Sequence, residues 1–515
     1  MWCSSEIIKK VVPVCCLFAV VLTVGLGYYA RSPKHLFFPD AMEYAAVARN
    51  MARGQGATSQ ALWVLRLAFT NELPASEVRR PLLLPLWTSL WFRLSAATDC
   101  VAIAASGFWW YAAVLLTFLL AWKKGSPEIA AWSVLFLVFD GSFLRYSFCG
   151  LSEPLFAFLL IPVFWLLCNS QRPMHFLGVG LLIGLGQWIR TNSLFLLLPA
   201  LVFVVAKARE KTLLRILCLV VGFGVAVVPI AVRNFSVMGT FALNPLYPYV
   251  ALNSTPLIPS AHGMERSIEP ISPMAYFLSN PAAFFSKWGT HFVNNYQCLA
   301  FSIYPLCLGV LIVGCLCLRE AQGRKACLFV LLSVVVSLIL LSLGEYEDIR
   351  FYVPFAPLIF VLAVQVIWEI GNNVGAKPWK TRALLGSLLT VGLIISVNHF
   401  SSVDENEGRN WYLERLAARV QTSVPADGVV VSDVPWVTGW RADRISVWLP
   451  AKVQELKSIE QDLPVAAVLL TQGALDPREF SPEWGAIHRG ESSLNGYMRT
   501  TWDDVPGVVL LRKME

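Results

Sequence analysis

The chain has 515 residues, of which 56% are hydrophobic and only 15% are charged, and its mean hydropathy is +0.59. Because a soluble domain carries about 25% charged residues, this composition excludes an ordinary soluble protein and indicates a polytopic α-helical membrane protein. The net charge of +7 gives no case for a nucleic-acid partner, since Lys and Arg of membrane proteins gather in cytoplasmic loops.

Eleven apolar runs are long enough to be membrane spans, since a bilayer core needs about 20 residues of helix. They are residues 11–30, 100–122, 127–144, 152–169, 174–190, 191–206, 213–232, 298–318, 326–343, 350–369 and 382–399. The first run resembles a signal peptide, but its length and the lack of a clear A-x-A site favour an uncleaved span. The shorter run 81–97 carries Arg93 and is either a twelfth span or a helix lying in the interface.

The distribution of basic residues favours eleven crossings over twelve. If 81–97 does not cross, all the basic clusters of the short loops fall on one side, as the positive-inside pattern requires. These clusters are Lys9/Lys10, Lys123/Lys124, Arg172, Lys207/Arg209/Lys211/Arg215, Arg319/Arg324/Lys325 and Lys377/Lys380/Arg382. The pattern predicts an amino terminus inside and a carboxyl terminus outside.

Three segments are then expected on the outer side: loop 31–99, loop 233–297 and the tail. We predict a transmembrane domain over 1–400 and a soluble extracytoplasmic α/β domain over 401–515. In the tail, strand-like runs (428–433, 445–450, 465–471 and 507–513) alternate with helix-like runs (404–421 and 451–463). The second loop contains two N-x-S/T sequons, at Asn234 and Asn253.

The stretch PDAMEYAAVARNMARGQG (39–56) begins soon after the first apolar run. As a helix it places Asp40, Glu43 and Tyr44 on one face, with Gly54 and Gly56 ending it. Asp40 is the acid favoured as a functional residue because ionisable groups at membrane depth are costly and usually functional. The alternative is that Asp40 serves only as the helix N-cap.

Several arginines oppose the positive-inside bias because they lie at the outer ends of spans or loops. They are Arg79, Arg80, Arg145, Arg190, Arg233 and Arg350. Any one of them alone can be an interfacial anchor, whereas several converging on one pocket would suit a phosphate. Other outer acids are Asp140, Glu153, Glu345, Glu347 and Asp348, and His35 lies near Asp40 in the sequence.

Five segments, in this order, resemble the GT-C superfamily of membrane glycosyltransferases, nearest to the protein O-mannosyltransferases and lipid A aminoarabinose transferases (family 39-type). The segments are PDAMEYAAVARNMARGQG (39–56), RRPLLLPLW (79–87), YSFCGLSEPLFAFLL (146–160), GQWIRTNSLFLLLPAL (186–201) and IRFYVPFAPLIF (349–360). The mannosyltransferases carry adjacent Asp-Glu, whereas here Ala41 follows Asp40 and the next acid is Glu43.

The resemblance implies an inverting glycosyltransferase that moves a sugar from a polyprenyl-phosphate donor to a lipid, glycan or protein acceptor. It implies a multi-pass protein of the bacterial inner membrane with its active site outside the cytoplasm. Asp40 and Glu43 are then the catalytic residues. The implied residues for lipid phosphate and sugar are Arg79, Arg80, Arg145, Glu153, Arg190, Arg350 and Tyr352.

Two other classes of protein stay open from the sequence. One is a transporter or flippase of lipid-linked or small anionic substrates, although no paired repeats or broken mid-membrane helices are visible. The other is a non-catalytic envelope-assembly protein that binds a lipid head group. A divalent metal ion near Asp40 and Glu43 is also left open, and no other cofactor is indicated; the 12 cysteines show no metal-ligand spacing and are interpreted as packing residues.

Overall fold

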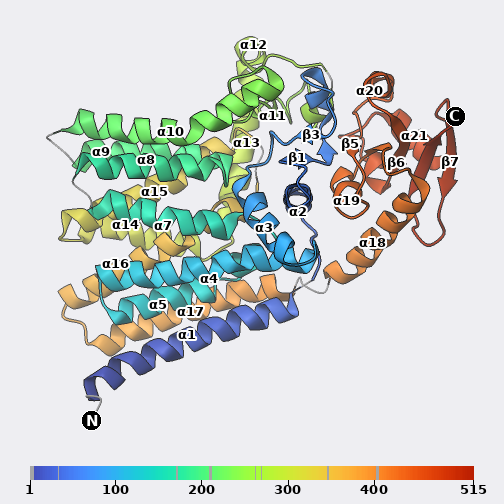
Figure 1. The fold of residues 1–515 in the computed structure, drawn as a ribbon. Coiled ribbons are helices and arrows are strands. Elements are labelled where there is room, and N and C mark those ends of the chain that lie inside the picture. The colour runs from blue at the N-terminus through green and yellow to red at the C-terminus, as the bar shows by residue number, and fades with distance from the viewer. Residues whose placement is uncertain are drawn as a thin grey trace.

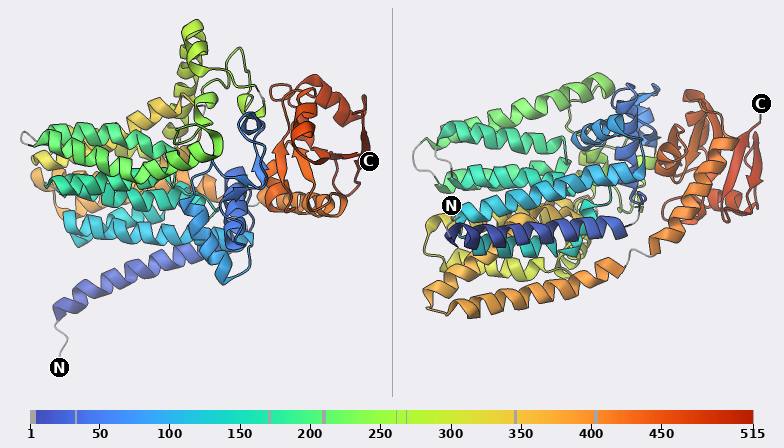
Figure 2. Two further views of the ribbon diagram at one scale, coloured as in Figure 1. Left: turned by 45° about the horizontal axis from the view of Figure 1, so that its top comes forward. Right: turned by 60° about the horizontal axis from the view of Figure 1, so that its bottom comes forward.

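The computed structural model describes residues 5–32, 34–169, 172–207, 211–260, 262–267, 269–344, 347–401 and 405–514. Its long helices run side by side as one bundle, and a layer of shorter helices and strands covers one end of that bundle (Figure 1). A sheet flanked by helices lies beyond this layer and contains the carboxyl-terminal residues. Two further views show the same arrangement of bundle, covering layer and sheet region (Figure 2).

The bundle contains most of the apolar helices. They are α1 (Ser5–Arg31), α4 (Asp99–Lys124), α5 (Pro127–Val138), α6 (Gly141–Ser147), α7 (Glu153–Asn169), α8 (Pro173–Gln187), α9 (Leu197–Lys207), α10 (Thr212–Met238), α14 (Tyr304–Cys317), α15 (Ala321–Leu341), α16 (Ala356–Asn373) and α17 (Pro378–Ser401). Among the described residues, five helices are long and apolar enough to cross a membrane, or up to seven if two bent pairs each count as one span. The chain is therefore a helical integral membrane protein.

Each of the eleven predicted ranges falls on a helix or a broken helix. The pair α5–α6 is bent by 64°, and α13 (Pro281–Ala300) meets α14 at 93°. Several of the other helices are shorter than the roughly 20 residues of a full crossing, so the number of crossings stays a prediction. The run 81–97 forms α3 (Leu83–Leu94), whose 12 residues are too few to cross and which lies beside α2 in the covering layer (Figure 1).

Helices α8 and α10 pack unusually closely through glycine. A Cβ at Gly180 would lie 2.0 Å from the backbone oxygen of Leu219, and a Cβ at Gly222 would lie 2.1 Å from that of Leu177. Small residues permit such close approach in membranes, where van der Waals packing drives helix association.

Both outer loops contribute to the covering layer. The first loop forms α2 (Pro39–Ala52), β1 (Thr58–Ser59), β2 (Ala61–Leu62), η1 (Val64–Ala68), β3 (Ala75–Ser76) and α3. The second forms α11 (Tyr247–Val250), η3 (Met264–Arg266), α12 (Pro273–Ser279) and α13. The two loops pack against each other, with Asn244 of the second loop donating to the backbone oxygen of Arg79 at 3.2 Å.

The carboxyl-terminal region is a mixed sheet with flanking helices. Its elements are α18 (Glu405–Ser423), β4 (Val429–Ser432), α19 (Pro435–Trp440), β5 (Ser446–Trp448), α20 (Glu455–Asp462), β6 (Val465–Leu470), η6 (Gln472–Leu475), α21 (Pro482–Arg489), β7 (Tyr497–Thr501) and β8 (Val509–Lys513). The strand order is β2-β5-β4-β6-β8-β7. All four predicted strands are present, and β7, which the sequence analysis missed, is a mostly exposed edge strand.

One edge of this sheet comes from the first outer loop. Strand β2 runs parallel to β5, with Ala61 opposite Ser446 and Leu62 opposite Val447. The sheet is therefore continuous with the segment that follows helix α2, and its position is tied to that helix.

Candidate active site

Helix α2 begins one residue before Asp40. Phe38 is the N-cap residue, Pro39 occupies the first helical position and Asp40 lies in the first turn. The alternative that Asp40 is the N-cap is therefore wrong, because proline at the first helical position shifts the cap to Phe38. A carboxylate in the first turn is still favoured by the helix dipole. The helix ends at Ala52, before two glycines with positive φ.

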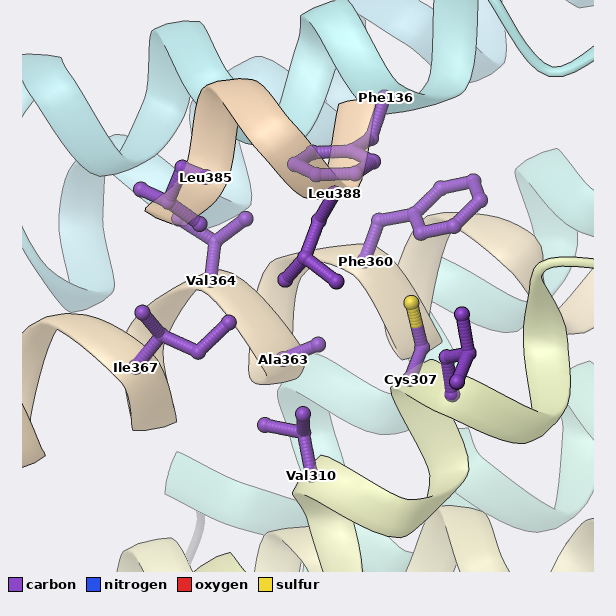
Figure 3. Close-up of a pocket in the computed structure, with 10 residues that line it drawn as sticks. Phe136, Cys307, Val310, Phe360, Ala363, Val364, Ile367, Leu385 and Leu388 are labelled. Carbon is purple, nitrogen blue, oxygen red and sulfur yellow. The ribbon is translucent and has the colours of Figure 1, made fainter. Parts of the chain in front are cut away.

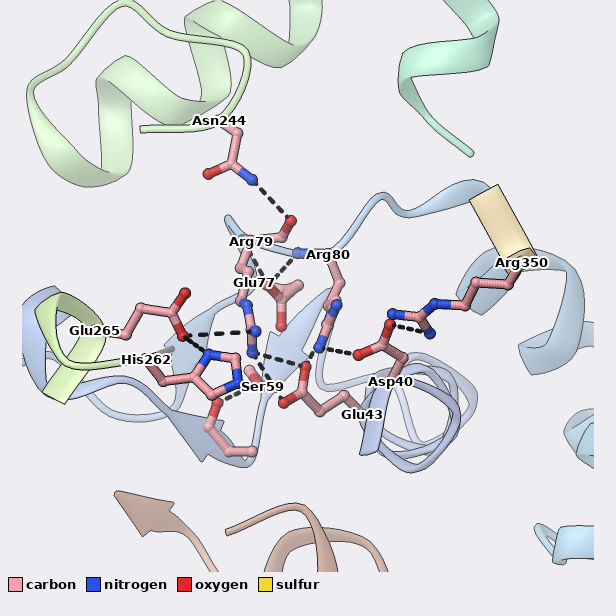
Figure 4. A network of polar contacts seen from close by, with 11 residues as sticks. Asp40, Glu43, Ser59, Glu77, Arg79, Arg80, Asn244, His262, Glu265 and Arg350 are labelled. Carbon is pink, nitrogen blue, oxygen red and sulfur yellow. Dashed lines mark hydrogen bonds and ion pairs between the residues drawn. The ribbon is translucent and has the colours of Figure 1, made fainter. Parts of the chain in front are cut away.

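Asp40 lies between two arginines that come from distant parts of the chain. Its Oδ1 accepts a hydrogen bond from Nη2 of Arg80 at 2.6 Å, and its Oδ2 accepts one from Nη1 of Arg350 at 3.0 Å (Figure 4). The side chain of Asp40 is 22% exposed, so one part of the carboxylate stays accessible. The first outer loop and η4 (Ile349–Phe351), a 3₁₀ turn that precedes α16, thus meet at this residue.

Glu43 lies one turn further along the same face of α2 and is 3% exposed. Its carboxylate accepts from Nη1 of Arg79 at 3.1 Å and from Nε of Arg80. Arg80 therefore bridges Asp40 and Glu43, using the fork of donors that a guanidinium presents.

The pKa of Asp40 lies well below its usual range. Burial alone would raise it, but the positive charges of Arg80, Arg350, Arg79 and Arg190 outweigh burial and lower it. Asp40 is therefore ionised at neutral pH, and in this arrangement it is a weak proton acceptor.

A second acid–arginine pair borders the site. Nη1 of Arg190 lies 2.5 Å from Oε1 of Glu153, which is buried. The guanidinium of Arg190 lies 5.1 Å from the ring centre of Phe351, and that of Arg350 lies 5.0 Å from the same ring. Arg190 and Arg350 therefore share one aromatic neighbour, and Asp40, Glu43, Arg79, Arg80, Glu153, Arg190 and Arg350 are brought together as predicted from sequence.

Two predicted site residues lie outside this group. The hydroxyl of Tyr352 is buried and donates to Oδ1 of Asn295 at 3.3 Å, away from Asp40, so its predicted role in binding substrate has no support here. Arg145 lies with its guanidinium 5.9 Å from the ring of Tyr146, whose hydroxyl donates to Asp348. Arg145 thus borders the site without contacting its carboxylates.

The remaining outer acids have structural partners. Asp140 is the N-cap of α6 and accepts a hydrogen bond from the hydroxyl of Tyr304 at 2.6 Å. Glu347 pairs with His291. Asp348 lies 3.6 Å from Arg350, whereas Glu345 lies outside the described residues.

His35 does not reach Asp40. Its Nδ1 lies 3.5 Å from Glu414 and 3.9 Å from Asp99. His35 is therefore paired with Glu414 and Asp99, although Asp40 is the acid nearest to it in the sequence.

Four residues that the sequence analysis missed support Arg79 and Arg80. Oε1 of Glu77 accepts the backbone N–H groups of both arginines at 2.7 Å and shapes their turn. The guanidinium of Arg79 lies 3.2 Å from the ring centre of Trp63. Its Nη2 lies 3.9 Å from Glu265, which pairs with His262 at 3.3 Å (Figure 4). Glu77 was detectable from its spacing to the arginine pair, whereas Glu265 and His262 lie in the second loop without a local signal.

The residues do not fit the divalent metal ion that the sequence left open. Across the described parts of the chain, no group of three or more His, Cys, Asp or Glu is arranged to hold one. Asp40 and Glu43 are instead bridged by Arg80, whose positive charge occupies the place a cation would take. We therefore derive no step through a metal.

An apolar cavity of about 10 Å³ lies within the bundle, between α5, α14, α16 and α17 (Figure 3). Its walls include Phe136, Cys307, Phe360 and Leu388. Such a lining offers no donor or acceptor suited to a sugar or a phosphate. The polar chemistry is therefore found at the end of the bundle, around Asp40.

The fold and this site define an integral membrane protein whose charged centre lies where helix α2 of the covering layer meets the bundle. No protein-family model matches the chain, and no curated protein sequence matches it. The chain does match solved structures. ArnT from Cupriavidus metallidurans bound to undecaprenyl phosphate matches with a TM-score of 0.59 and 13% identity, covering 97% of this chain and 97% of that chain.

Two further structures give the same result. The apo state of that ArnT matches with a TM-score of 0.57, 13% identity and 97% coverage of each chain. The apo oligosaccharyltransferase of Archaeoglobus fulgidus matches with a TM-score of 0.55 and 11% identity, over 88% of this chain and 69% of that chain. Both proteins are GT-C superfamily members, and this chain has the GT-C fold, as its sequence motifs predicted.

Proposed function

We propose that this protein is a glycosyltransferase that moves a sugar from a polyprenyl-phosphate donor to an acceptor at the extracytoplasmic face of the membrane. The observation that carries the proposal is Asp40, held between Arg80 and Arg350 at the end of the helix bundle. This placement joins a carboxylate that can accept a proton to cations that suit a phosphate, at the depth where a lipid-linked donor presents its head group.

The transfer itself is a displacement at the anomeric carbon. The acceptor hydroxyl or amine attacks that carbon, its proton passes to Asp40, and the bond from the carbon to the phosphate oxygen breaks. The electron pair stays on that oxygen, and Arg80, Arg350 and Arg190 stabilise the charge that develops there. Attack from the side opposite the phosphate inverts the anomeric configuration.

Binding of the donor would also activate the base. In the described arrangement the arginines hold the pKa of Asp40 low, so the carboxylate accepts a proton poorly. A donor phosphate offers oxygens that compete for the same guanidinium groups. As Arg80 and Arg350 turn to the phosphate, Asp40 loses their charge and its pKa rises toward its ordinary value.

The distribution of basic residues supports an extracytoplasmic site. Lys123 and Lys124 end helix α4, Arg319 lies in the turn between α14 and α15, Arg324 lies in the first turn of α15, and Lys377 precedes α17. These turns lie at the end of the bundle opposite α2 (Figure 1). By the positive-inside rule that end is cytoplasmic, which places α2, both outer loops and the carboxyl-terminal domain outside.

The decisive experiment measures transfer of radiolabelled sugar from a polyprenyl-phosphate donor by the full-length protein in nanodiscs, with membrane extracts as acceptor source. Wild-type protein is expected to consume the donor, and Asp40→Asn is expected to lower the rate by about 10²- to 10⁴-fold while leaving folding intact. Asp504→Asn, at a half-buried acid of the carboxyl-terminal region, is the matched control and should retain normal activity.

The same experiment separates the rival classes. A flippase would move the labelled lipid between leaflets without breaking its sugar–phosphate bond, and a non-catalytic binding protein would only retain it. Normal transfer by Asp40→Asn would show that another group is the base.

A further inference from the structure

A small polar cavity of about 20 Å³ lies next to Glu43, between α2, residues 59–79 of the same outer loop and Leu246 of the second loop. Polar residues in its wall are Glu43, Ser59, Trp63, Arg66, Ser76, Glu77 and Arg79. A volume of this size admits one water-sized group, such as a single oxygen atom of a larger molecule. The cavity therefore connects the acidic face of α2 to a set of donors outside the Asp40 cluster.

Two of the donors that line this cavity have no partner. Nε1 of Trp63 and Nε of Arg66 are buried and make no hydrogen bond among the described residues, and each side chain belongs to a residue that is only 5% exposed. A buried donor without an acceptor is costly, by about 1–3 kcal/mol for a neutral group and more for a charged one. Both side chains therefore mark a place where an oxygen is expected.

The charge around Arg66 is unbalanced in favour of cations. Arg233, near the end of α10, lies close enough to act on Arg66, and its Nη2 is also buried without a partner among the described residues. The buried carboxylate that acts on both arginines is Glu77, whose Oε1 already accepts two backbone N–H groups. Glu72, the other acid near Arg66, is exposed to solvent.

We propose that Arg66 and Trp63, which line the cavity, form with the neighbouring Arg233 a second oxyanion site, separate from Asp40, that holds a carboxylate or phosphate group of the acceptor. This assignment rests on the proposed function. The donor phosphate has its own cations in Arg80 and Arg350, and Glu43 lies between those cations and the cavity. An acceptor anchored here would lie on the Glu43 side of Arg80, next to the proposed base Asp40.

Burial also lowers the pKa of Arg66, and Glu77 only partly offsets that effect. A bound oxyanion would supply the missing negative charge and the missing acceptors together. Because guanidinium binds carboxylate and phosphate alike, the site selects for an anionic acceptor rather than for one particular group.

The test uses inorganic phosphate as the probe and the full-length protein in phosphatidylcholine nanodiscs. Thermal unfolding is followed as phosphate is added at constant ionic strength, since a ligand that binds the folded state raises the unfolding temperature. In the Arg350→Gln background, which weakens the donor site, the unfolding temperature should still rise as phosphate is added. Adding Arg66→Gln or Arg233→Gln should abolish this rise or raise the half-saturating phosphate concentration at least tenfold.

The variant Glu77→Gln should change phosphate affinity in the opposite direction, and a gain in affinity cannot be explained by loss of folding. The amide oxygen can still accept the two backbone N–H groups, but the negative charge is gone, so half-saturation should occur at several-fold lower phosphate. If Arg66→Gln, Arg233→Gln and Glu77→Gln all bind phosphate with the same affinity as the Arg350→Gln protein, the proposed oxyanion site does not exist.

Transfer assays distinguish failure of this site from failure of the proposed function. If transfer occurs and Arg66→Gln leaves the KM for acceptor unchanged, the oxyanion site is overturned while the glycosyltransferase stands. If no transfer occurs, the phosphate titration still decides whether the oxyanion site exists. In the expected case, Arg66→Gln raises the acceptor KM at least tenfold and leaves undecaprenyl phosphate affinity within twofold of wild type.

Discussion

Arg49 of helix α2 pairs with Asp443 of the carboxyl-terminal region at 2.8 Å. The same guanidinium donates to the backbone oxygens of Gly439 at 2.8 Å and Trp440 at 2.6 Å, across about 390 residues of sequence. At the other end of α2, Arg441 donates to the backbone oxygen of Leu36 at 3.0 Å. The residues 439–443 thus hold both ends of the helix that carries Asp40 and Glu43.

The contacts of residues 439–443 with both ends of α2 are called the clamp. They predict that Asp443→Ala weakens docking of the carboxyl-terminal region on α2. Asp443 also accepts from Arg53 and Gln60, so its loss leaves several donors without their acceptor. We expect the stability to fall by about 1–2 kcal/mol and amide hydrogen exchange in α2 to increase. Transfer should slow several-fold because Asp40 is held less firmly.

Asp504→Ala is the matched control for the clamp. Asp504 pairs with Arg419 at 3.0 Å and is 30% exposed, against 31% for Asp443, but its pair lies within the carboxyl-terminal domain. This variant should leave exchange in α2 unchanged. Equal rates of amide hydrogen exchange in α2 of both variants would mean that the clamp does not restrain the helix.

Arg80→Lys tests whether the guanidinium fork is needed. A lysine ammonium is a compact charge and cannot bridge Asp40 and Glu43 with two separate edges as Arg80 does. We expect the affinity for undecaprenyl phosphate to fall at least tenfold, measured by competition with a labelled donor. Arg419→Lys, at an exposed pair, should change the affinity less than twofold.

Arg350→Gln should change the pH dependence of transfer. In the wild type, burial raises the pKa of Asp40 but Arg80 and Arg350 lower it more, so the carboxylate stays ionised well below pH 4. Removing Arg350 raises this pKa. The acid limb of kcat/KM should therefore move to higher pH in Arg350→Gln, whereas Arg415→Gln, on α18, should reproduce the wild-type profile. An unchanged acid limb would exclude Asp40 as the titrating group.

Much of this architecture was predictable because membrane spans and the α2 motif carry local signals. A crossing helix needs a long apolar run, and all eleven predicted ranges fall on helices. The spacing of Asp40 and Glu43 placed both on one helix face, and Arg79 and Arg80 stood out as cations in an outer loop. The structure confirms that these four side chains meet.

What the sequence could not reveal depends on contacts between distant segments. Strand β2 has only two residues, and its pairing with β5 is set by tertiary packing rather than by any local pattern. Tyr352 was grouped with Arg350 because they are two residues apart. In the 3₁₀ turn that contains Arg350, residues two apart point in different directions, so Tyr352 meets Asn295 instead.

His262 should make stability depend weakly on pH. Burial opposes its charge, but Glu265 outweighs burial and raises the pKa of His262 above its ordinary value. The pair therefore stabilises the fold fully below about pH 6.5, the unfolded value, and this contribution is lost as pH rises through the folded pKa. Because His262 is 47% exposed, the difference from His262→Gln should be below about 1 kcal/mol. The check is unfolding of the wild type and of His262→Gln measured from pH 5 to 9, and a stability difference that does not change with pH would contradict this assignment.

The two sequons should carry no glycan, because both asparagines are buried. Asn253 is 0% exposed, and its Oδ1 accepts the backbone N–H of Met264 at 2.9 Å; Asn234 donates to the backbone oxygen of Ala242 at 2.8 Å. Asn253→Ala should therefore lower stability by about 1–3 kcal/mol, since it leaves a buried N–H without an acceptor. Asn372→Ala, at an exposed position, should cost less than about 0.5 kcal/mol. Expression in a glycosylating host followed by mass spectrometry checks the first expectation, and a mass shift that Asn253→Gln removes would contradict the buried placement of this loop.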